Sequence, residues 1–126
     1  MKKRILYVDD SPINRLYFKQ LLLAEAHEML EAEDGESGWQ IALDEKPDII
    51  FTDLLMPGMD GFELTRQIKA NPELCHIPVI TLTAYGNKGT ERIAKAAGSD
   101  LFLLKPLNVQ QVHSLLCQFL GSVQLR

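Results

Sequence analysis

The sequence predicts an α/β fold: a five-stranded parallel sheet, doubly wound, with helices on both faces. Five short apolar runs, rich in branched residues, alternate with five segments of helical periodicity along the 126 residues. Strands that are buried on both faces of a parallel sheet have this continuous apolar character, and their alternation with helices is typical of the fold class. The predicted strands are residues 5–8, 27–32, 49–52, 78–83 and 101–104.

The first two helices are predicted from their ends. Ser11 is a favourable N-cap and Pro12 a favourable first helical residue, so the first helix should run from Pro12 to about Ala24. The second helix follows a turn at residues 33–35, and it must stop before Pro47 because proline cannot continue a helical hydrogen-bond ladder.

The last three helices follow in the same way. The third ends near Ala70, before an Asn-Pro pair. The fourth spans residues 89–97 and is closed by Gly98, which favours a left-handed cap. The fifth begins at Asn108, with Gln111 at the third helical position as in a capping box. We assign residues 1–121 to one domain and residues 122–126 to a frayed C-terminal tail.

Connection rules predict the strand order 2-1-3-4-5, which is the flavodoxin-like arrangement. Right-handed crossovers limit the topologies, and the first and third strands should flank the switch point where the chain reverses direction across the sheet. A flavin is excluded as a ligand: its phosphate needs a loop rich in Ser, Thr or Gly after the first strand, whereas Asp9 and Asp10 stand there and repel a phosphate.

Composition excludes several functional classes. The formal net charge of −4 argues against nucleic-acid binding. No apolar stretch approaches the roughly 20 residues of a membrane span, and the N-terminus lacks a signal-peptide core. Cys75 and Cys117 have no metal-ligand spacing, so we interpret them as reduced thiols in a cytoplasmic protein.

Charged side chains stand where the predicted strands end. Asp9 and Asp10 follow the first strand, Asp53 the third and Lys105 the fifth, while the fourth ends in Thr83. Carboxyl ends of parallel strands border the ligand crevice, so these groups should share one edge of the sheet. Two carboxylates about 4 Å apart repel by roughly 4 kcal/mol at an effective dielectric near 20. A hard divalent cation relieves this repulsion, and oxygen-only ligation favours Mg²⁺ or Mn²⁺ over zinc.

The same cluster can carry out phosphoryl chemistry. A carboxylate that is partly free of the metal can attack phosphorus and form an aspartyl phosphate. The Lys105 ammonium and the Thr83 hydroxyl would then balance the charge of the phosphoryl group, together with the metal. A separate general base is unnecessary because a carboxylate is already ionised at neutral pH.

Over nearly its full length the chain resembles the receiver domain of two-component response regulators, the family of the bacterial chemotaxis regulator. The matching features are the pair Asp9 and Asp10, the segment around Asp53 at residues 52–61, Thr83 followed by alanine, and Lys105 followed by proline. Each feature alone is weak evidence, but all of them in order at the correct strand ends are highly specific.

The resemblance implies a phosphoacceptor and a metal site. Asp53 would be the residue that is phosphorylated. Asp10 and Asp53 would bind Mg²⁺ directly, Asp9 would act through water, and the backbone carbonyl of Leu55 would be a further ligand.

The resemblance also implies a conformational switch. Lys105 would contact the phosphoryl group, and Thr83 would be the switch hydroxyl. Phe102 would be the aromatic switch residue, although an ordinary core phenylalanine is the alternative. The bond before Pro106 would be cis.

The predicted function is a signalling switch that accepts a phosphoryl group from a histidine kinase or phosphotransfer protein in a Mg²⁺-dependent reaction. It would be no enzyme in the usual sense, although it would catalyse its own phosphorylation and slow autodephosphorylation. The alternatives are a receiver excised from a hybrid kinase or larger regulator, and a Mg²⁺-dependent phosphohydrolase. The hydrolase class requires an Asp-x-Asp loop and a cap domain, for which the chain has no residues left.

Partners are predicted at two surfaces. The phosphodonor should dock on the rim of the first helix and the loop after the fifth strand, and a downstream protein on the face of helix 4, strand 5 and helix 5. The switch is expected to be a monomer or a weak phosphorylation-dependent dimer. Asn14 and Tyr17 have an inward-facing alternative. The docking candidates are Ile13, Asn14, Tyr17, Pro106 and Val109.

Overall fold

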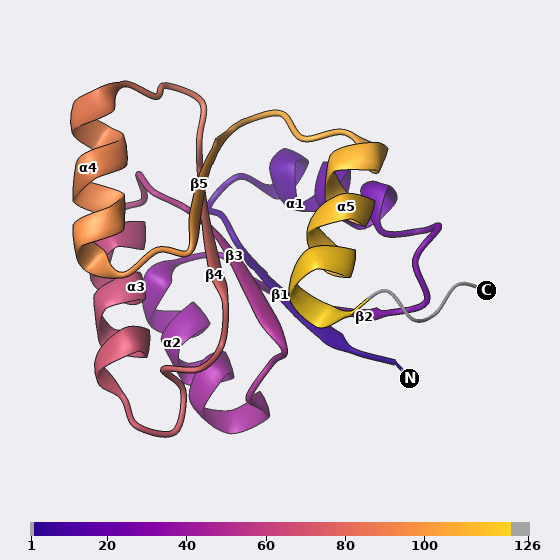
Figure 1. The fold of residues 1–126 in the computed structure, drawn as a ribbon, viewed down its shortest axis with the longest axis horizontal. Helices are drawn as coiled ribbons and strands as arrows, with labels where there is room; N and C mark the ends of the chain where they lie inside the picture. The colour runs from indigo at the N-terminus through magenta and orange to yellow at the C-terminus, as the bar shows by residue number, and fades with distance from the viewer. Residues whose placement is uncertain (1, 122–126) are drawn as a thin grey trace.

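The computed structural model describes residues 2–121, and it forms one parallel sheet flanked by helices (Figure 1). The predicted tail at residues 122–126 lies outside the described residues. The strands are β1 (Arg4–Val8), β2 (Glu28–Ala32), β3 (Ile49–Asp53), β4 (Val79–Thr83) and β5 (Leu101–Leu104). The helices are α1 (Pro12–Leu21), α2 (Gly35–Glu45), α3 (Gly61–Ala70), α4 (Lys88–Ala97) and α5 (Val109–Leu120).

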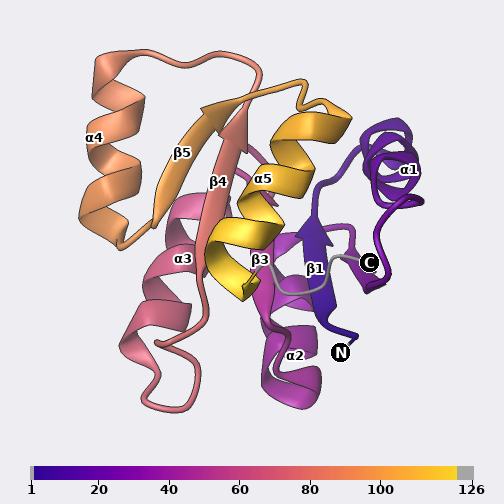
Figure 2. The same cartoon turned by 45° about the vertical axis from the view of Figure 1, so that its right-hand side comes forward.

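The sheet order is β2-β1-β3-β4-β5, with every neighbouring pair parallel. This confirms the predicted fold class and strand order. The arrowheads of β1, β4 and β5 point the same way, so the loops that leave them gather at one end of the molecule (Figure 2). No helix among residues 2–121 has the length and apolar character needed to cross a membrane.

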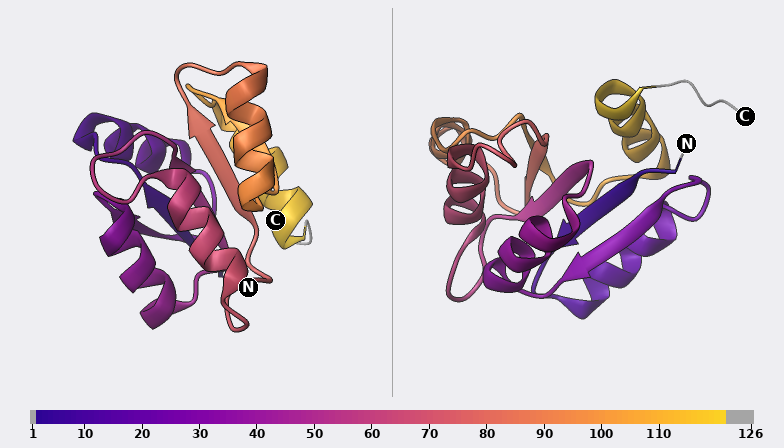
Figure 3. Two further views of the ribbon diagram at one scale, coloured as in Figure 1. Left: turned by 90° about the vertical axis from the view of Figure 1, so that its left-hand side faces the viewer. Right: turned by 90° about the horizontal axis from the view of Figure 1, so that it is seen from below.

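Two apolar layers cover the sheet, because successive strand residues point to opposite faces. Ile5, Tyr7 and Phe51 pack with α1 and α5, whereas Leu6 and Val8 pack with α2 and α3 on the other face. The views from the side and from below show these helices on opposite sides of the sheet (Figure 3). The sheet is therefore buried on both faces, and its carboxyl edge remains the place for polar groups.

The first helix is shorter than predicted. It ends at Leu21 instead of near Ala24, because the chain tightens there into bonds three residues apart, from Leu22 N–H to Lys19 and from Leu23 N–H to Gln20. This turn buries both Leu21 and Leu22 against the core. The other boundaries shift by a residue or so: β2 begins at Glu28 and α4 at Lys88, one residue away from the predicted positions.

Gly61 fixes the distance between the start of α3 and the end of β3. Its N–H donates to the carbonyl of Leu54 at 2.9 Å. A Cβ at this position would lie 2.2 Å from the carbonyl oxygen of Asp53 and 2.8 Å from Cα of Leu54. Both are backbone atoms that cannot rotate away, so a side chain here would displace either the helix or the strand end that carries Asp53.

We predict that Gly61→Ala lowers the free energy of unfolding by about 1–3 kcal/mol, the usual cost of overpacking. Urea denaturation followed by circular dichroism measures this. The matched control is Gly89→Ala in α4, where the nearest atom to the added Cβ is the side-chain oxygen of Asn87 at 3.2 Å. That control should change stability by less than about 1 kcal/mol. Equal effects of the two substitutions would contradict the close approach at Gly61.

Candidate functional site

Strand register brings acids and an amine to the same corner of the sheet. Asp9 directly follows β1 and Asp53 is the last residue of β3, two positions after Phe51 on the face of α1 and α5. Lys105 follows β5, two positions after Leu103 on the same face. Side chains at positions i and i+2 of a strand share a face, so the apolar pattern of the strands determines where these charges lie.

Three carboxylates meet at this edge. One oxygen each of Asp9, Asp10 and Asp53 lies within 4.8 Å of the other two. Asp9 and Asp53 are buried, while Asp10 is exposed. This donor set consists of carboxylate oxygens alone, with one open side, which suits a hard octahedral cation that keeps several waters. The residues present therefore fit Mg²⁺ or Mn²⁺.

Asp9 is fully buried, and its carboxylate accepts four hydrogen bonds. Its Oδ1 accepts from the backbone N–H of Ser11 at 2.9 Å. Its Oδ2 accepts from the Tyr7 hydroxyl at 3.0 Å, from Asn14 Nδ2 at 3.3 Å and from Lys105 Nζ at 2.9 Å. A buried carboxylate is tolerated when it is paired and hydrogen-bonded in this way.

Lys105 bridges two of the acids, since its ammonium lies 2.9 Å from Asp9 Oδ2 and 3.3 Å from Asp53 Oδ1. Burial alone would lower the pKa of Lys105, but the hydrogen bond to Asp9 and the charge of Asp53 outweigh it and raise that pKa. The lysine is thus held in its charged form. One ammonium faces three carboxylates, so the corner remains short of positive charge.

The shortage of positive charge affects the pKa of Asp53. Burial raises the pKa of Asp53, and the negative charge of Asp9 raises it further, against the opposing attraction of Lys105. A raised pKa means that the ionised form is less favourable in the folded protein than in water. A cation at the carboxylates would remove this penalty.

Thr83 and Phe102 lie on the opposite face of the sheet, toward α4. Thr83 is buried, and its hydroxyl accepts from the Tyr85 N–H at 3.2 Å and lies 3.3 Å from the Tyr85 carbonyl. Phe102 is partly buried beside the loop between β4 and α4, because a Cβ on Gly86 would lie 3.3 Å from its ring. The hydroxyl therefore contacts this loop in the described conformation.

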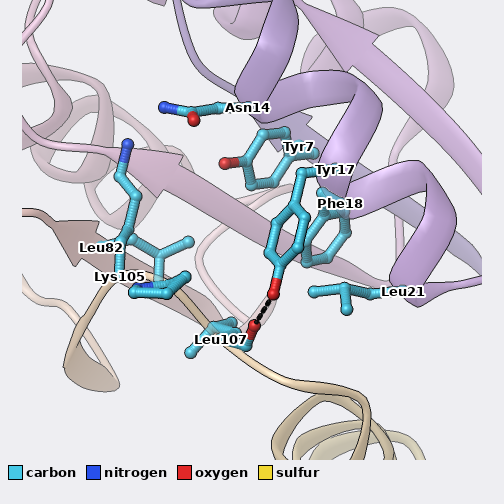
Figure 4. Close-up of a pocket in the computed structure, with 9 residues that line it drawn as sticks. Tyr7, Asn14, Tyr17, Phe18, Leu21, Leu82, Lys105 and Leu107 are labelled. Atoms are coloured by element: carbon cyan, nitrogen blue, oxygen red, sulfur yellow. Dashed lines mark hydrogen bonds between the residues drawn. The ribbon is translucent and has the colours of Figure 1, made fainter.

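The rim of α1 and the loop after β5 is largely accessible. Ile13, Tyr17 and Val109 are large exposed apolar residues. The Tyr17 hydroxyl nevertheless donates to the Leu107 carbonyl at 2.7 Å, across a small cavity of about 50 Å³ (Figure 4). Asn14 differs from the rest of the rim, since it is partly buried and bonds Asp9.

Tyr7 was not predicted at this site, and Asn14 was predicted only as a docking residue with an inward-facing alternative. Tyr7 and Asn14 both bond Asp9, whereas the sequence pointed to charged and hydroxyl groups at strand ends. A signal for Tyr7 existed in the sequence: it lies two residues before Asp9 on the same strand face, and a buried tyrosine hydroxyl needs a partner.

Two other predicted residues lie in the loops after β3 and β5. The Lys105–Pro106 peptide bond is cis, and Leu55 is exposed.

Comparison with known proteins identifies related chains. The family model described as "Response regulator receiver domain" matches residues 5–116. A curated relative, the polar-differentiation response regulator DivK of Brucella anthropi, is 31% identical over 122 residues, covering 97% of this chain and 99% of the relative. The similarity therefore extends over almost the full length of both chains.

Two similar solved structures hold metal ions. The receiver domain of the sensor histidine kinase PA1611 from Pseudomonas aeruginosa, with magnesium coordinated in its active-site cleft, matches with a TM-score of 0.88 and 28% identity over 97% of this chain and 100% of that one. The Mn²⁺-bound response regulator Rcp1 matches with a TM-score of 0.82 and 27% identity, over 98% of this chain and 99% of that chain.

We predict that Asp53→Asn stabilises the metal-free protein at neutral pH, by on the order of 1 kcal/mol. The folded-state pKa of Asp53 is raised above 3.8, so the native state binds more protons than the unfolded state between the two values. The ionised wild type therefore loses stability as pH rises through this window, and the variant does not. Below about pH 3.8 the difference should vanish.

Denaturation of both proteins in a chelator across pH 3–8 measures this difference. Added Mg²⁺ should narrow the neutral-pH gap, since it relieves the wild type. A variant less stable than wild type at neutral pH would contradict the charge imbalance.

Proposed function

The chain belongs to the response regulator receiver domain family, and on that premise we propose that it is a phosphorylation-activated signalling switch. In this proposal Asp53 accepts a phosphoryl group from a phosphohistidine on a histidine kinase or phosphotransfer protein. The reaction depends on Mg²⁺, and the phosphorylated protein signals by protein contact. Residues 1–121 act as the receiver domain.

The observation that carries the proposal is the bridged acid corner. Lys105 lies 3.3 Å from Asp53 Oδ1, and the oxygens of Asp9 and Asp10 lie beside the same carboxylate. The corner thus combines a carboxylate nucleophile, an ammonium for the incoming phosphoryl oxygens and an oxygen donor set for a divalent metal. Family membership gives these groups their roles.

The transfer step needs little covalent machinery from the protein. The Asp53 carboxylate attacks phosphorus in line with the histidine nitrogen, so an O–P bond forms as the N–P bond breaks and the imidazole leaves. The Lys105 ammonium neutralises one phosphoryl oxygen, and Thr83 is the hydroxyl assigned to another. Because the Thr83 hydroxyl contacts Tyr85 in the described conformation, it must turn to do so.

The proposed metal ligands are Asp10 and Asp53 directly, Asp9 through water, and the backbone carbonyl of Leu55. The three donors already on Asp9 Oδ2 support the indirect role of Asp9. When bound, the cation supplies the positive charge that the corner lacks. Mg²⁺ is the physiological candidate, and Mn²⁺ has the same donor preference.

We infer that the switch links the two faces of the sheet. Movement of the Thr83 hydroxyl away from Tyr85 would free the loop between β4 and α4, against which Phe102 packs. The surface of α4, β5 and α5 would change, and a downstream protein would read that change. The phosphoryl group can bias this equilibrium only by its differential interaction with the two states.

The proposal also covers the phosphodonor, the lifetime of the aspartyl phosphate and the compartment in which the protein acts. The exposed rim of Ile13, Tyr17, Pro106 and Val109 suits a phosphodonor. We propose that the aspartyl phosphate of this protein hydrolyses slowly. We also propose that the protein acts in the cytoplasm. The alternative is a receiver that is part of a hybrid kinase or larger regulator. The receiver domain of the sensor histidine kinase PA1611 also holds magnesium in its active-site cleft, so the proposed chemistry is the same whether the domain acts alone or within a larger protein.

We predict that acetyl phosphate with Mg²⁺ phosphorylates the protein at Asp53, because positioning and charge neutralisation reside in the receiver itself. Intact-mass spectrometry should show one added phosphoryl group that is sensitive to hydroxylamine. Chelation should abolish the labelling, and Asp53→Asn should reduce it at least about a hundredfold.

Asp44→Asn serves as the matched control, since Asp44 is exposed near the C-terminal end of α2, whereas the acid corner lies where β1 and β3 end. It should label like the wild type. Equal labelling of the Asp53→Asn variant would refute Asp53 as the phosphoacceptor, and steady turnover of an added phosphomonoester would indicate a phosphohydrolase instead.

A further inference from the structure

We propose that Tyr7 is a positioning residue for phosphoryl transfer, holding Asp9 in place when Lys105 moves from Asp9 to the phosphoryl group. The inference rests on the proposed function of Asp53 and extends it to a residue two positions before the acidic pair. It is carried by the hydrogen bond between the Tyr7 hydroxyl and Asp9 Oδ2, together with the burial of both groups.

The Tyr7 hydroxyl is fixed by its surroundings. The side chain is 3% exposed, and its ring stacks on Phe18 with centroids 4.3 Å apart and an interplanar angle of 11°. The strand fixes the backbone and the stack fixes the ring, so the hydroxyl has little freedom to leave Asp9. Figure 4 shows the Tyr7 ring beside Phe18, with its hydroxyl at the end of the pocket where Asn14 and the Lys105 ammonium lie.

Lys105, in contrast, is shared between two acids. Its ammonium lies 2.9 Å from Asp9 Oδ2 and 3.3 Å from Asp53 Oδ1. A phosphoryl group on Asp53 adds negative oxygens on that side, and a lysine that turns to them gives up its bond to Asp9. Asp9 is fully buried in the described conformation, so its Oδ2 would lose one of its three donors in a place with little access to bulk water.

Leaving a buried acceptor without a partner costs about 1–3 kcal/mol, and more when the group is charged. Tyr7 and Asn14 donate to the same oxygen as Lys105, at 3.0 Å and 3.3 Å. Asp9 Oδ2 therefore stays hydrogen-bonded after the lysine has moved. These two neutral donors lower the cost of releasing Lys105, and so favour the phosphorylated state over the free one.

Binding of the metal should respond in the opposite way. A phenol that donates to Asp9 withdraws negative charge from the oxygen cluster that attracts Mg²⁺. Removing the hydroxyl should leave Mg²⁺ affinity unchanged or slightly higher, while it makes Asp9 hold Lys105 more strongly. If Tyr7 is a positioning residue, loss of its hydroxyl should lower the affinity for a phosphoryl group without lowering the affinity for Mg²⁺. General structural damage to the site would instead lower both affinities.

The test compares wild type with Tyr7→Phe, which keeps the ring and its stack. Calorimetry measures the Mg²⁺ affinity, and then the beryllofluoride affinity at saturating Mg²⁺. We expect beryllofluoride to bind about tenfold more weakly and acetyl phosphate to react correspondingly more slowly, the size of one hydrogen bond to a charged group. Mg²⁺ affinity should not fall.

Two further variants keep the test decisive. Ile68→Val removes a methyl group from the core on the other face of the sheet and leaves all four donors to the Asp9 carboxylate, so it should retain both affinities despite lower stability. Asn14→Ala removes the partly buried, longer donor to Asp9 Oδ2 at 3.3 Å. It should weaken beryllofluoride binding by less than Tyr7→Phe does, again with no fall in Mg²⁺ affinity.

A parallel loss of Mg²⁺ and beryllofluoride affinity in Tyr7→Phe, or no change in either, would overturn the positioning role. If the wild type itself bound beryllofluoride with no Mg²⁺ requirement, or not at all, the proposed function would fail instead. The two failures are therefore distinguishable.

Discussion

The structure depends on one electrostatic imbalance: three carboxylates share a sheet edge with a single ammonium. Lys105 compensates for part of the repulsion, and burial makes the remainder costly by raising the pKa of Asp53. In the folded protein, the carboxylates of this corner offer negative charge to a divalent cation, and in the proposed function Lys105 offers positive charge to a phosphoryl group. Both charges are already in place in a partly buried corner.

The fold positions these charged groups in two ways: side chains alternate between the faces of each strand, and the backbone of α3 packs closely against β3. Side chains alternate along the strands, so Tyr7 and Phe51 are buried against α1 and α5, and the partly buried Leu103 packs there too. The next residue on the same face of each strand, Asp9, Asp53 or Lys105, then lies at the edge. Gly61 lets α3 approach the carbonyl of Asp53 closely, so the strand end that carries the proposed phosphoacceptor packs directly against the helix. Thr83 lies on the other face, where its hydroxyl contacts the loop before α4, and in the proposed function this hydroxyl links phosphorylation to that loop.

Much of this could be predicted from the sequence, because the apolar runs end in charge at the same edge. The fold class and the strand order followed from periodicity and crossover rules, and the cluster of Asp9, Asp10 and Asp53 followed from topology. The end of α1 was predicted too far along, since helical periodicity does not reveal the tightened turn at Leu22. Tyr7 was not predicted at the site, and Asn14 was predicted as a docking residue but not as a partner of Asp9, because both bonds are to a buried oxygen that only the folded chain defines.

The most direct test of the charge imbalance is the Mg²⁺ affinity of Lys105→Met, measured by calorimetry against wild type at neutral pH. If Lys105 and the metal compensate for the same carboxylates, removing the ammonium should strengthen Mg²⁺ binding, by about tenfold for a change of 1.4 kcal/mol. The same variant should lose phosphorylation by acetyl phosphate. Weaker Mg²⁺ binding in a folded Lys105→Met variant would contradict the account, because the lysine would then be organising the metal site instead of competing with the cation.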